Sequence, residues 1–134
     1  MLTYLTIGAN DLERSGRFYE AVLRPLGYTR SDSAEGIAFA PPRGSTAGTI
    51  YVVKPFDGRP ATPANGLMPA FQSPTQALVR ALHEAGRAAG GTDEGAPGFR
   101  AAYSANFYVA YLRDPVGNKL ALFCSDPAEG TRPT

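Results

Sequence analysis

The hydrophobic pattern in the first half of the chain predicts one strand, one helix and three further strands. Residues 3–8 alternate between polar and apolar side chains, as in a strand with one buried face. Residues 11–24 carry apolar side chains at helical spacing. Asn10 and Asp11 precede this helix and are expected to supply its N-cap and a first-turn acid. Three short strands are then predicted at 28–31, 36–40 and 49–54.

The second half repeats this order of elements about 64 residues later. A strand at 67–71 leads to a helix that is expected to be capped by Ser73, with Pro74 at its first position. The apolar stripe of this helix is assigned to Leu78, Leu82, Ala85 and Ala89. A Gly-rich loop follows, and three strands are predicted near 100–103, 107–113 and 118–124.

The repeated order predicts an α+β fold in which two βαβββ modules form one domain, because one module alone cannot cover its own sheet. The modules span about 1–57 and 65–126, the domain spans 1–126, and residues 127–134 form a C-terminal tail. The segment from Pro55 to Asn65 is expected to join the modules as a loop rather than as a flexible linker. The helices would cover one face of a curled mixed sheet, and the other face would curl around a cavity.

The composition excludes several kinds of partner. Thirteen basic and twelve acidic residues give a formal net charge of +1, and no basic patch stands out, so nucleic acid and membrane surfaces are not expected partners. Cys124 is the only cysteine, which rules out a disulfide within the chain and fits a reducing compartment. Neither a secretory signal nor a membrane-spanning run is visible, so a cytoplasmic location is expected.

Three stretches resemble the glyoxalase / bleomycin-resistance / extradiol-dioxygenase superfamily, also called the vicinal oxygen chelate superfamily. Residues 7–19 resemble its first strand and helix, and Pro25-Leu26-Gly27-Tyr28 resembles the exit from that helix. Residues 111–118 resemble the turn before its last strand. Together these stretches occur in the right order on the right duplicated pattern, and only the part after Asp126 lies outside the match.

The resemblance implies a metal site that has lost its ligands. Metal-using members hold an ion with His, His and Glu, and the corresponding positions are Tyr4, Met68 and Ala121 in this chain. An ion that chelates two substrate oxygens needs imidazole or carboxylate ligands, so neither a metal nor another cofactor is expected. The only histidine, His83, is assigned to the exposed face of the second helix.

The candidate binding residues follow from strand alternation and from the resemblance. They are Tyr4, Tyr51, Met68, Tyr103, Tyr111 and Phe123. For Tyr51 and Tyr103 a place in the core or at the rim is the alternative. Arg100 would either pair with an anionic ligand group or be solvated. Cys124 is interpreted as a buried apolar residue, Asp93 and Glu94 as solvated, and Gly95–Gly98 as a loop over one cavity mouth.

Three functions remain open. The first is a binding protein that holds a small aromatic or mixed-polarity molecule without metal. The second is a glyoxalase-like lyase or isomerase, or a dioxygenase-type enzyme, which works without metal or with unrecognised ligands; Tyr4 or Tyr111 would then act as acid or base. The third is a structural or regulatory domain with a filled cavity. A homodimer is expected in each case, because the superfamily often pairs its modules between chains, and no catalytic residue is assigned.

Overall fold

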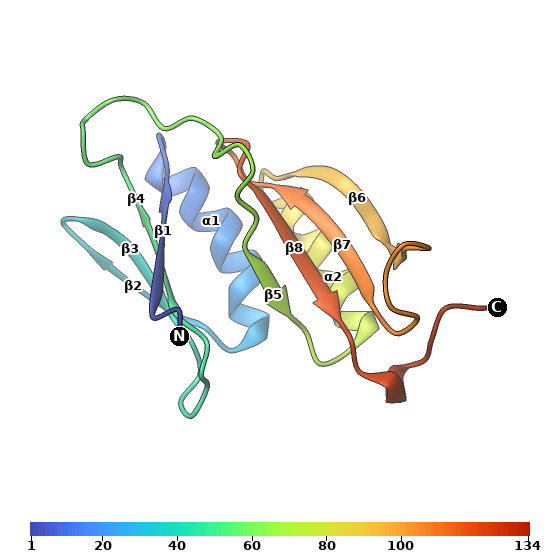
Figure 1. Ribbon diagram of the computed structural model, residues 1–134. Helices are drawn as coiled ribbons and strands as arrows, with labels where there is room; N and C mark the ends of the chain where they lie inside the picture. Colours follow the sequence, from blue (N-terminus) through green and yellow to red (C-terminus); the bar gives the residue numbers. More distant parts are fainter.

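The computed structural model describes residues 1–134 and contains two four-stranded mixed sheets, each backed by one helix (Figure 1). The first module contains β1 (Tyr4–Gly8), α1 (Leu12–Leu23), the short 3-10 helix η1 (Arg24–Leu26), β2 (Thr29–Ser33), β3 (Gly36–Ala40) and β4 (Thr49–Val53). The second contains β5 (Ala70–Gln72), α2 (Gln76–Ala88), β6 (Thr92–Phe99), β7 (Tyr108–Arg113) and β8 (Lys119–Cys124). A second 3-10 helix, η2 (Pro127–Glu129), follows β8.

The two sheets have the same topology, which confirms the predicted duplication. Their strand orders are β1-β4-β3-β2 and β5-β8-β7-β6. In each sheet the first and last strands of the module pair in parallel, and the other neighbours are antiparallel. The α+β fold of two βαβββ modules is therefore confirmed. The sheets do not close around a cavity, and no ladder of hydrogen bonds joins one to the other.

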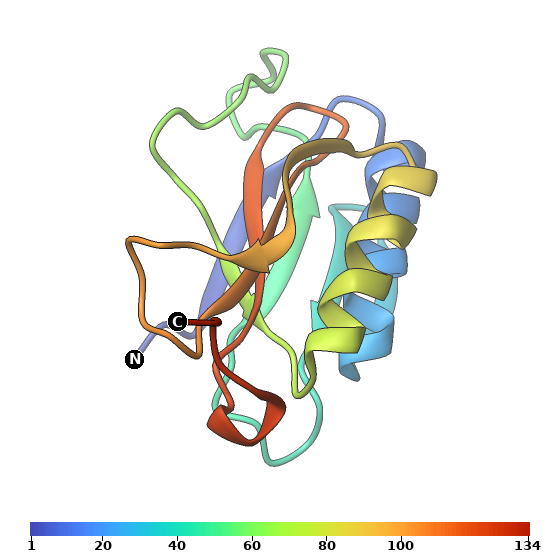
Figure 2. The same ribbon diagram turned by 90° about the vertical axis from the view of Figure 1, so that its right-hand side faces the viewer.

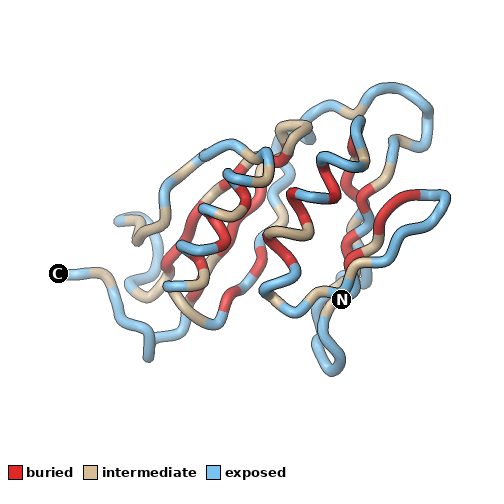
Figure 3. The backbone as a smooth tube through the Cα atoms, turned by 180° about the vertical axis from the view of Figure 1, so that it is seen from behind, coloured by how far each residue is buried: buried red, intermediate tan, exposed pale blue.

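The core lies between the sheets and a single layer of two helices (Figure 2). Burial is concentrated on one side of each helix and on the strands against which the helices pack (Figure 3). Gly86 of α2 allows this helix to pack closely on both β7 and α1, because a Cβ atom there would lie 2.5 Å from Leu112 of β7 and 3.2 Å from Val22 of α1. Tyr28 and Phe71 join the modules by an edge-to-face contact with ring centroids 6.3 Å apart.

The helices begin at slightly different residues from those expected. Asp11 caps α1 by accepting a hydrogen bond from the Arg14 N–H. The cap of α2 is Thr75, whose hydroxyl accepts from the Leu78 N–H, so the assignment of the cap to Ser73 is wrong. The Ser73 hydroxyl instead donates to the Thr75 carbonyl at 2.9 Å, which forms a turn ahead of the helix.

The strand predicted near 100–103 is also misplaced. The strand is β6, Thr92–Phe99, although it contains Gly95, Pro97 and Gly98. It is the edge strand of its sheet, where the missing N–H of proline costs no ladder bond, and two register irregularities accommodate its other residues. The Gly95–Gly98 stretch therefore belongs to a strand and is not a loop over a cavity mouth.

The segment that joins the modules is held by side chains from both of them. The Asn10 amide donates to the Ala61 carbonyl at 3.0 Å and accepts from the Ala61 N–H at 2.6 Å, so Asn10 binds this segment and does not cap α1. Asn118 accepts from the Ala64 N–H at 2.9 Å. These contacts agree with a fixed joining loop. Neither α1 nor α2 has the length and apolar character needed to cross a membrane.

Candidate functional site

The face of both sheets that points away from the helices, here called the open face, carries exposed aromatic and apolar side chains. Tyr4, Tyr51, Met68 and Tyr103 are between 38% and 60% exposed. Strand alternation explains the exposure of the two tyrosines on the first sheet, because the neighbours of Tyr4 and Tyr51 along β1 and β4, such as Ile7 and Val52, are buried against the helices. The open face is where a ligand or another chain would meet apolar surface.

A hollow of about 610 Å³ lies on the open face of the second sheet. It is lined by Met68, Ala70, Ala102, Tyr103, Ser104, Phe107, Val109, Tyr111, Ala121 and Phe123. Its floor consists of small residues, because Tyr111 pairs across the sheet with Ala121, which in turn pairs with Ala70. Two alanines beside one tyrosine leave the space that larger side chains would fill.

The loop that follows β6 builds one wall of this hollow. In Figure 2 this loop stands out on the side of the sheets away from the helices. Phe107 at its end stacks on Phe123, with ring centroids 5.2 Å apart and planes inclined by 26°. Tyr103 meets Phe107 edge to face at 5.6 Å. The wall is therefore a chain of three aromatic rings that begins in the loop and ends on β8.

The structure brings together four of the six predicted binding residues. Met68, Tyr103, Tyr111 and Phe123 all line the hollow. The other two lie on the first sheet, where they contact each other; they are Tyr4 and Tyr51, with ring centroids 5.6 Å apart in an edge-to-face arrangement. The prediction did not include Phe107 or Val109. Alternation along β7 would have added Val109 to Tyr111, but Phe107 precedes the strand and has no such signal.

Two basic side chains, here called the basic rim, lie against the ring of Tyr111. The Lys119 ammonium is 4.7 Å from the ring centroid and the Arg100 guanidinium carbon is 5.5 Å from it. A Cβ atom at Gly95 would lie 2.7 Å from the Tyr111 ring, so only glycine at this position leaves enough space for the ring. Burial, followed by the neighbouring Tyr103 hydroxyl, raises the pKa of Tyr111, while Arg100 opposes this change.

The donor groups of the hollow do not fit a divalent metal ion. Of the three positions that the resemblance assigns to ligands, Met68 and Ala121 line the hollow and offer only a thioether and a methyl group. The third, Tyr4, lies on the other sheet. No group of three or more His, Cys, Asp or Glu side chains in the chain is placed to hold a metal. The hollow therefore offers apolar contacts in place of imidazole and carboxylate ligands.

His83 is not on an exposed helix face, as was predicted, but is buried with 5% of its surface exposed. It belongs to the buried stripe of α2, which is Val79, Leu82, His83 and Gly86. Its Nε2 lies 2.9 Å from Oδ1 of Asp93 on β6, and because a carboxylate only accepts, the ring N–H donates. This hydrogen bond, followed by one from the Gly95 N–H, lowers the pKa of Asp93.

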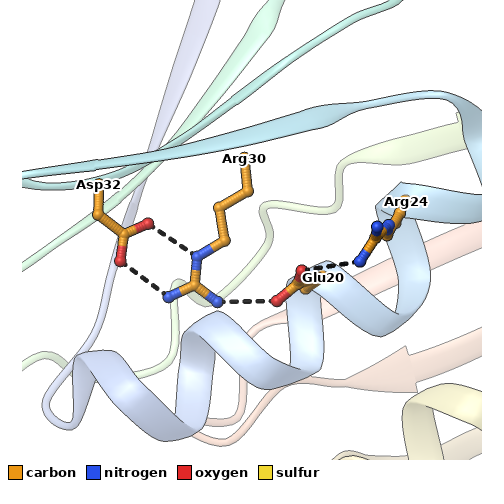
Figure 4. A network of polar contacts seen from close by, with 4 residues as sticks. All are labelled: Glu20, Arg24, Arg30 and Asp32. Carbon is orange, nitrogen blue, oxygen red and sulfur yellow. Dashed lines mark hydrogen bonds and ion pairs between the residues drawn. The ribbon is translucent and has the colours of Figure 1, made fainter.

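The other polar clusters are internally satisfied. Glu94 pairs with Arg113 at 3.2 Å, and Asp93 binds His83. The prediction that both acids are simply solvated is therefore wrong. On the helix side, Arg30 bonds both Asp32 and Glu20, and Glu20 also meets Arg24 (Figure 4). This group has two positive and two negative charges and ties β2 to α1. Cys124 is fully buried, as predicted, and its Sγ lies 3.7 Å from the Pro74 carbonyl.

The chain is similar to several solved structures of glyoxalase-related proteins. A glyoxalase/bleomycin resistance protein from Albidiferax ferrireducens T118 is 38% identical with a TM-score of 0.82, and the match covers 94% of this chain and 99% of that protein. A glyoxalase-related enzyme from Fulvimarina pelagi is 20% identical with a TM-score of 0.72 over 100% of this chain and 97% of that protein. A lactoylglutathione lyase from Agrobacterium tumefaciens is 18% identical with a TM-score of 0.60 over 92% of each chain. The last two share the fold alone. No family model and no curated protein matches the chain.

Proposed function

Because this chain belongs to the glyoxalase/bleomycin resistance protein family, we propose that it binds a small aromatic or mixed-polarity molecule in the hollow of its second sheet, without a metal ion. The observation that carries this proposal is the floor of the hollow. Ala121 occupies the position to which the resemblance assigns a metal ligand, and it lies beside Ala70 and Tyr111. The space that a ligated ion would need is lined by apolar groups.

The size and lining of the hollow support binding of a small molecule. Its volume of about 610 Å³ lies within the range of roughly 300–1,000 Å³ that is usual for small-molecule sites. Phe107 and Phe123 present a stacked aromatic wall, and the Tyr103 and Tyr111 hydroxyls add polar contacts. Such a wall favours a flat ligand, because rings gain about 0.5–1.5 kcal/mol from stacked or edge-on contacts beyond their buried area.

Proton transfer by tyrosine has less support than binding. Burial raises the pKa of Tyr111, so its tyrosinate form is scarcer at neutral pH than that of a free tyrosine. A general base works best when its pKa lies near the working pH. The enzyme alternative would therefore need a base other than Tyr111.

We further propose that the protein is a homodimer in which a second copy covers the open face. The hollow is open on the side away from the sheet, and Tyr4 and Tyr51 are exposed side by side on the same face of the neighbouring sheet. Exposed apolar side chains grouped on one face are typical of a surface that another chain covers. Tyr4 and Tyr51, which lie outside the hollow, would then form part of the contact between the two copies.

Binding of the neutral fluorescent dye N-phenyl-1-naphthylamine tests the proposed site, with metal analysis on the same sample. We expect saturable binding of about one dye per chain with a micromolar Kd that EDTA does not change. Ala70→Leu fills the floor of the hollow and should abolish binding, whereas Ala40→Leu, on an exposed position of β3, should not. Stoichiometric zinc, nickel, manganese or iron together with EDTA-sensitive binding would refute the metal-free proposal.

A further inference from the structure

We infer that the ligand of the hollow carries an anionic group, which the basic rim of Arg100 and Lys119 receives beside Tyr111. This inference rests on the proposed binding function and adds the chemical class of the ligand. The ligand would have an apolar or aromatic body seated among the phenylalanines and one carboxylate, sulfonate or phosphonate group at the Tyr111 end.

The two cations of the basic rim lie on different elements and reach the same tyrosine ring. Lys119 lies on β8 opposite Arg113 and faces the same side of the sheet as Ala121, two residues further along the strand. Its ammonium group folds back to 4.7 Å from the Tyr111 ring centroid. Arg100 begins the loop after β6 and reaches the same ring. Two cations from different elements therefore meet at one side chain that lines the hollow.

The charges at this place are not balanced within the chain. Neither Arg100 nor Lys119 forms an ion pair, although ion pairs engage several other arginines. Lys119 lies near enough to Glu94 to help lower the pKa of that carboxyl, but Glu94 is paired with Arg113 at 3.2 Å. In the network of Figure 4, by contrast, each arginine meets a carboxylate of the same chain. The basic rim thus has an excess of positive charge that an anion would neutralise.

The Arg100 side chain is held in place without a carboxylate. Its guanidinium donates to the carbonyls of Ala96 at 2.8 Å and of Gly98 at 3.0 Å. These bonds anchor the group and leave its charge uncompensated, since carbonyl oxygens are neutral. Placing a cation in advance lowers the entropy that anion binding costs. The flexible Lys119 adds a second charge that adjusts to the anion.

The two tyrosine hydroxyls complete the polar end. Tyr103 and Tyr111 both line the hollow, and the Tyr103 hydroxyl is close enough to help raise the pKa of Tyr111. A phenol hydroxyl can donate a hydrogen bond, and a donor beside two cations suits an oxyanion. A merely structural use of the cations, in which they only stabilise the Tyr111 ring, is the competing explanation.

A matched pair of dyes separates these explanations. 8-Anilinonaphthalene-1-sulfonate has the skeleton of N-phenyl-1-naphthylamine plus one sulfonate, and both report binding by fluorescence. We expect the wild-type protein to bind the sulfonate roughly tenfold more tightly than the neutral dye, with a preference that salt reduces. Lys119→Gln should remove most of this preference, and Lys119→Arg should keep it. Arg17→Gln, which removes the same charge from the exposed side of α1, is the control and should change nothing.

Each other outcome has a definite meaning. Equal binding of the two dyes by the wild-type protein would overturn the anionic ligand and leave the proposed function in place. Binding of neither dye would overturn both. If Lys119→Gln lowers both affinities by the same factor, or changes only thermal stability or dimer dissociation, the cations serve the fold or a partner chain and the inference fails.

Discussion

The hydroxyl of Tyr19 in α1 donates a hydrogen bond of 2.5 Å to Oδ2 of Asp114, 95 residues further along the chain. The other carboxylate oxygen of Asp114 accepts from the backbone N–H groups of Val116, Gly117 and Asn118. The Asn118 amide also donates to Asp114, and its oxygen accepts from Ala64 in the joining loop. One buried carboxylate therefore connects the first helix, the last turn and the segment between the modules.

Replacing Tyr19 by phenylalanine should weaken this connection and lower the free energy of unfolding. The variant removes one buried charge-assisted hydrogen bond and leaves the ring, so a loss of about 1–3 kcal/mol is expected in urea denaturation. Tyr28→Phe is the matched control, because Tyr28 is only partly buried and its hydroxyl makes no hydrogen bond within the chain. Equal losses in both variants would show that the Asp114 contact contributes nothing specific.

The same tyrosine should govern stability at alkaline pH. Burial, followed by the charge of Asp114, raises the pKa of Tyr19 well above its ordinary value of 10.0. A group whose pKa is raised in the folded state stabilises the fold fully below its unfolded pKa, and this contribution is lost as pH rises through the folded pKa. Wild-type stability should therefore fall above about pH 10, and the stability difference from Tyr19→Phe should shrink there. A difference that stays constant up to pH 12 would contradict this assignment.

Asp93→Asn should affect stability in the opposite pH range. His83 and the Gly95 N–H lower the pKa of Asp93 below its ordinary value of 3.8, so the ionised form stabilises the fold at neutral pH. This contribution is present above the unfolded pKa and is lost as pH falls from 3.8 through the folded pKa. Thermal melts should show a less stable variant at pH 7 and a smaller difference below pH 3. Glu84→Gln, which breaks only the exposed pair with Arg87, should show little effect at either pH.

The duplicated fold was predictable because its signal is periodic. Alternation in β1 and helical spacing in α1 place Tyr4 outward and Tyr19 inward without any knowledge of the other module. Of the open-face positions, Phe123 follows from the same rule, whereas Met68 and Tyr111 were assigned from the family resemblance. Their gathering around one hollow did not follow, because the registers that align Tyr111, Ala121 and Ala70 are set by strand pairing.

Three of the errors have a common physical cause, which is a contact with another element of the fold. His83 looked like a polar-face residue because its acceptor, Asp93, lies on another element. The glycines and proline of β6 suggested a loop, but an edge strand tolerates them. Phe107 belongs to the site only because its loop folds back onto β8. Local patterns contain none of these contacts.

The proposed dimer predicts a strong effect of a charge on the open face. Tyr4 is 60% exposed on β1, so Tyr4→Glu should leave the monomer folded while placing a carboxylate where a second copy would bury apolar surface. Sedimentation equilibrium should show that the dissociation constant of the dimer rises by at least roughly tenfold. Phe56→Glu, which changes an exposed aromatic residue in the joining loop, should not change the dimer. A wild-type protein that is monomeric at high micromolar concentration would refute the dimer.

Arg132 should control the loop that forms the wall of the hollow. Its guanidinium donates to the carbonyls of Arg100 and Tyr103, both at 2.9 Å, and its backbone N–H donates to Ala105 at 2.6 Å. The C-terminal segment thus fastens the loop that carries Tyr103 and leads to Phe107. Arg132→Ala removes the side-chain bonds, each worth about 1 kcal/mol, and should free the loop without touching the hollow itself.

The loop should then exchange its amide hydrogens faster, and the aromatic wall should be less well ordered before binding. The affinity for N-phenyl-1-naphthylamine should fall roughly three- to tenfold, because the ligand must now order the loop as it binds. Hydrogen exchange over residues 100–107 and dye titration measure the two effects. Arg43→Ala, an exposed arginine with no ion pair, is the control for lost charge. Faster exchange with unchanged affinity would show that the loop does not contribute to binding, and unchanged exchange would show that Arg132 does not hold it.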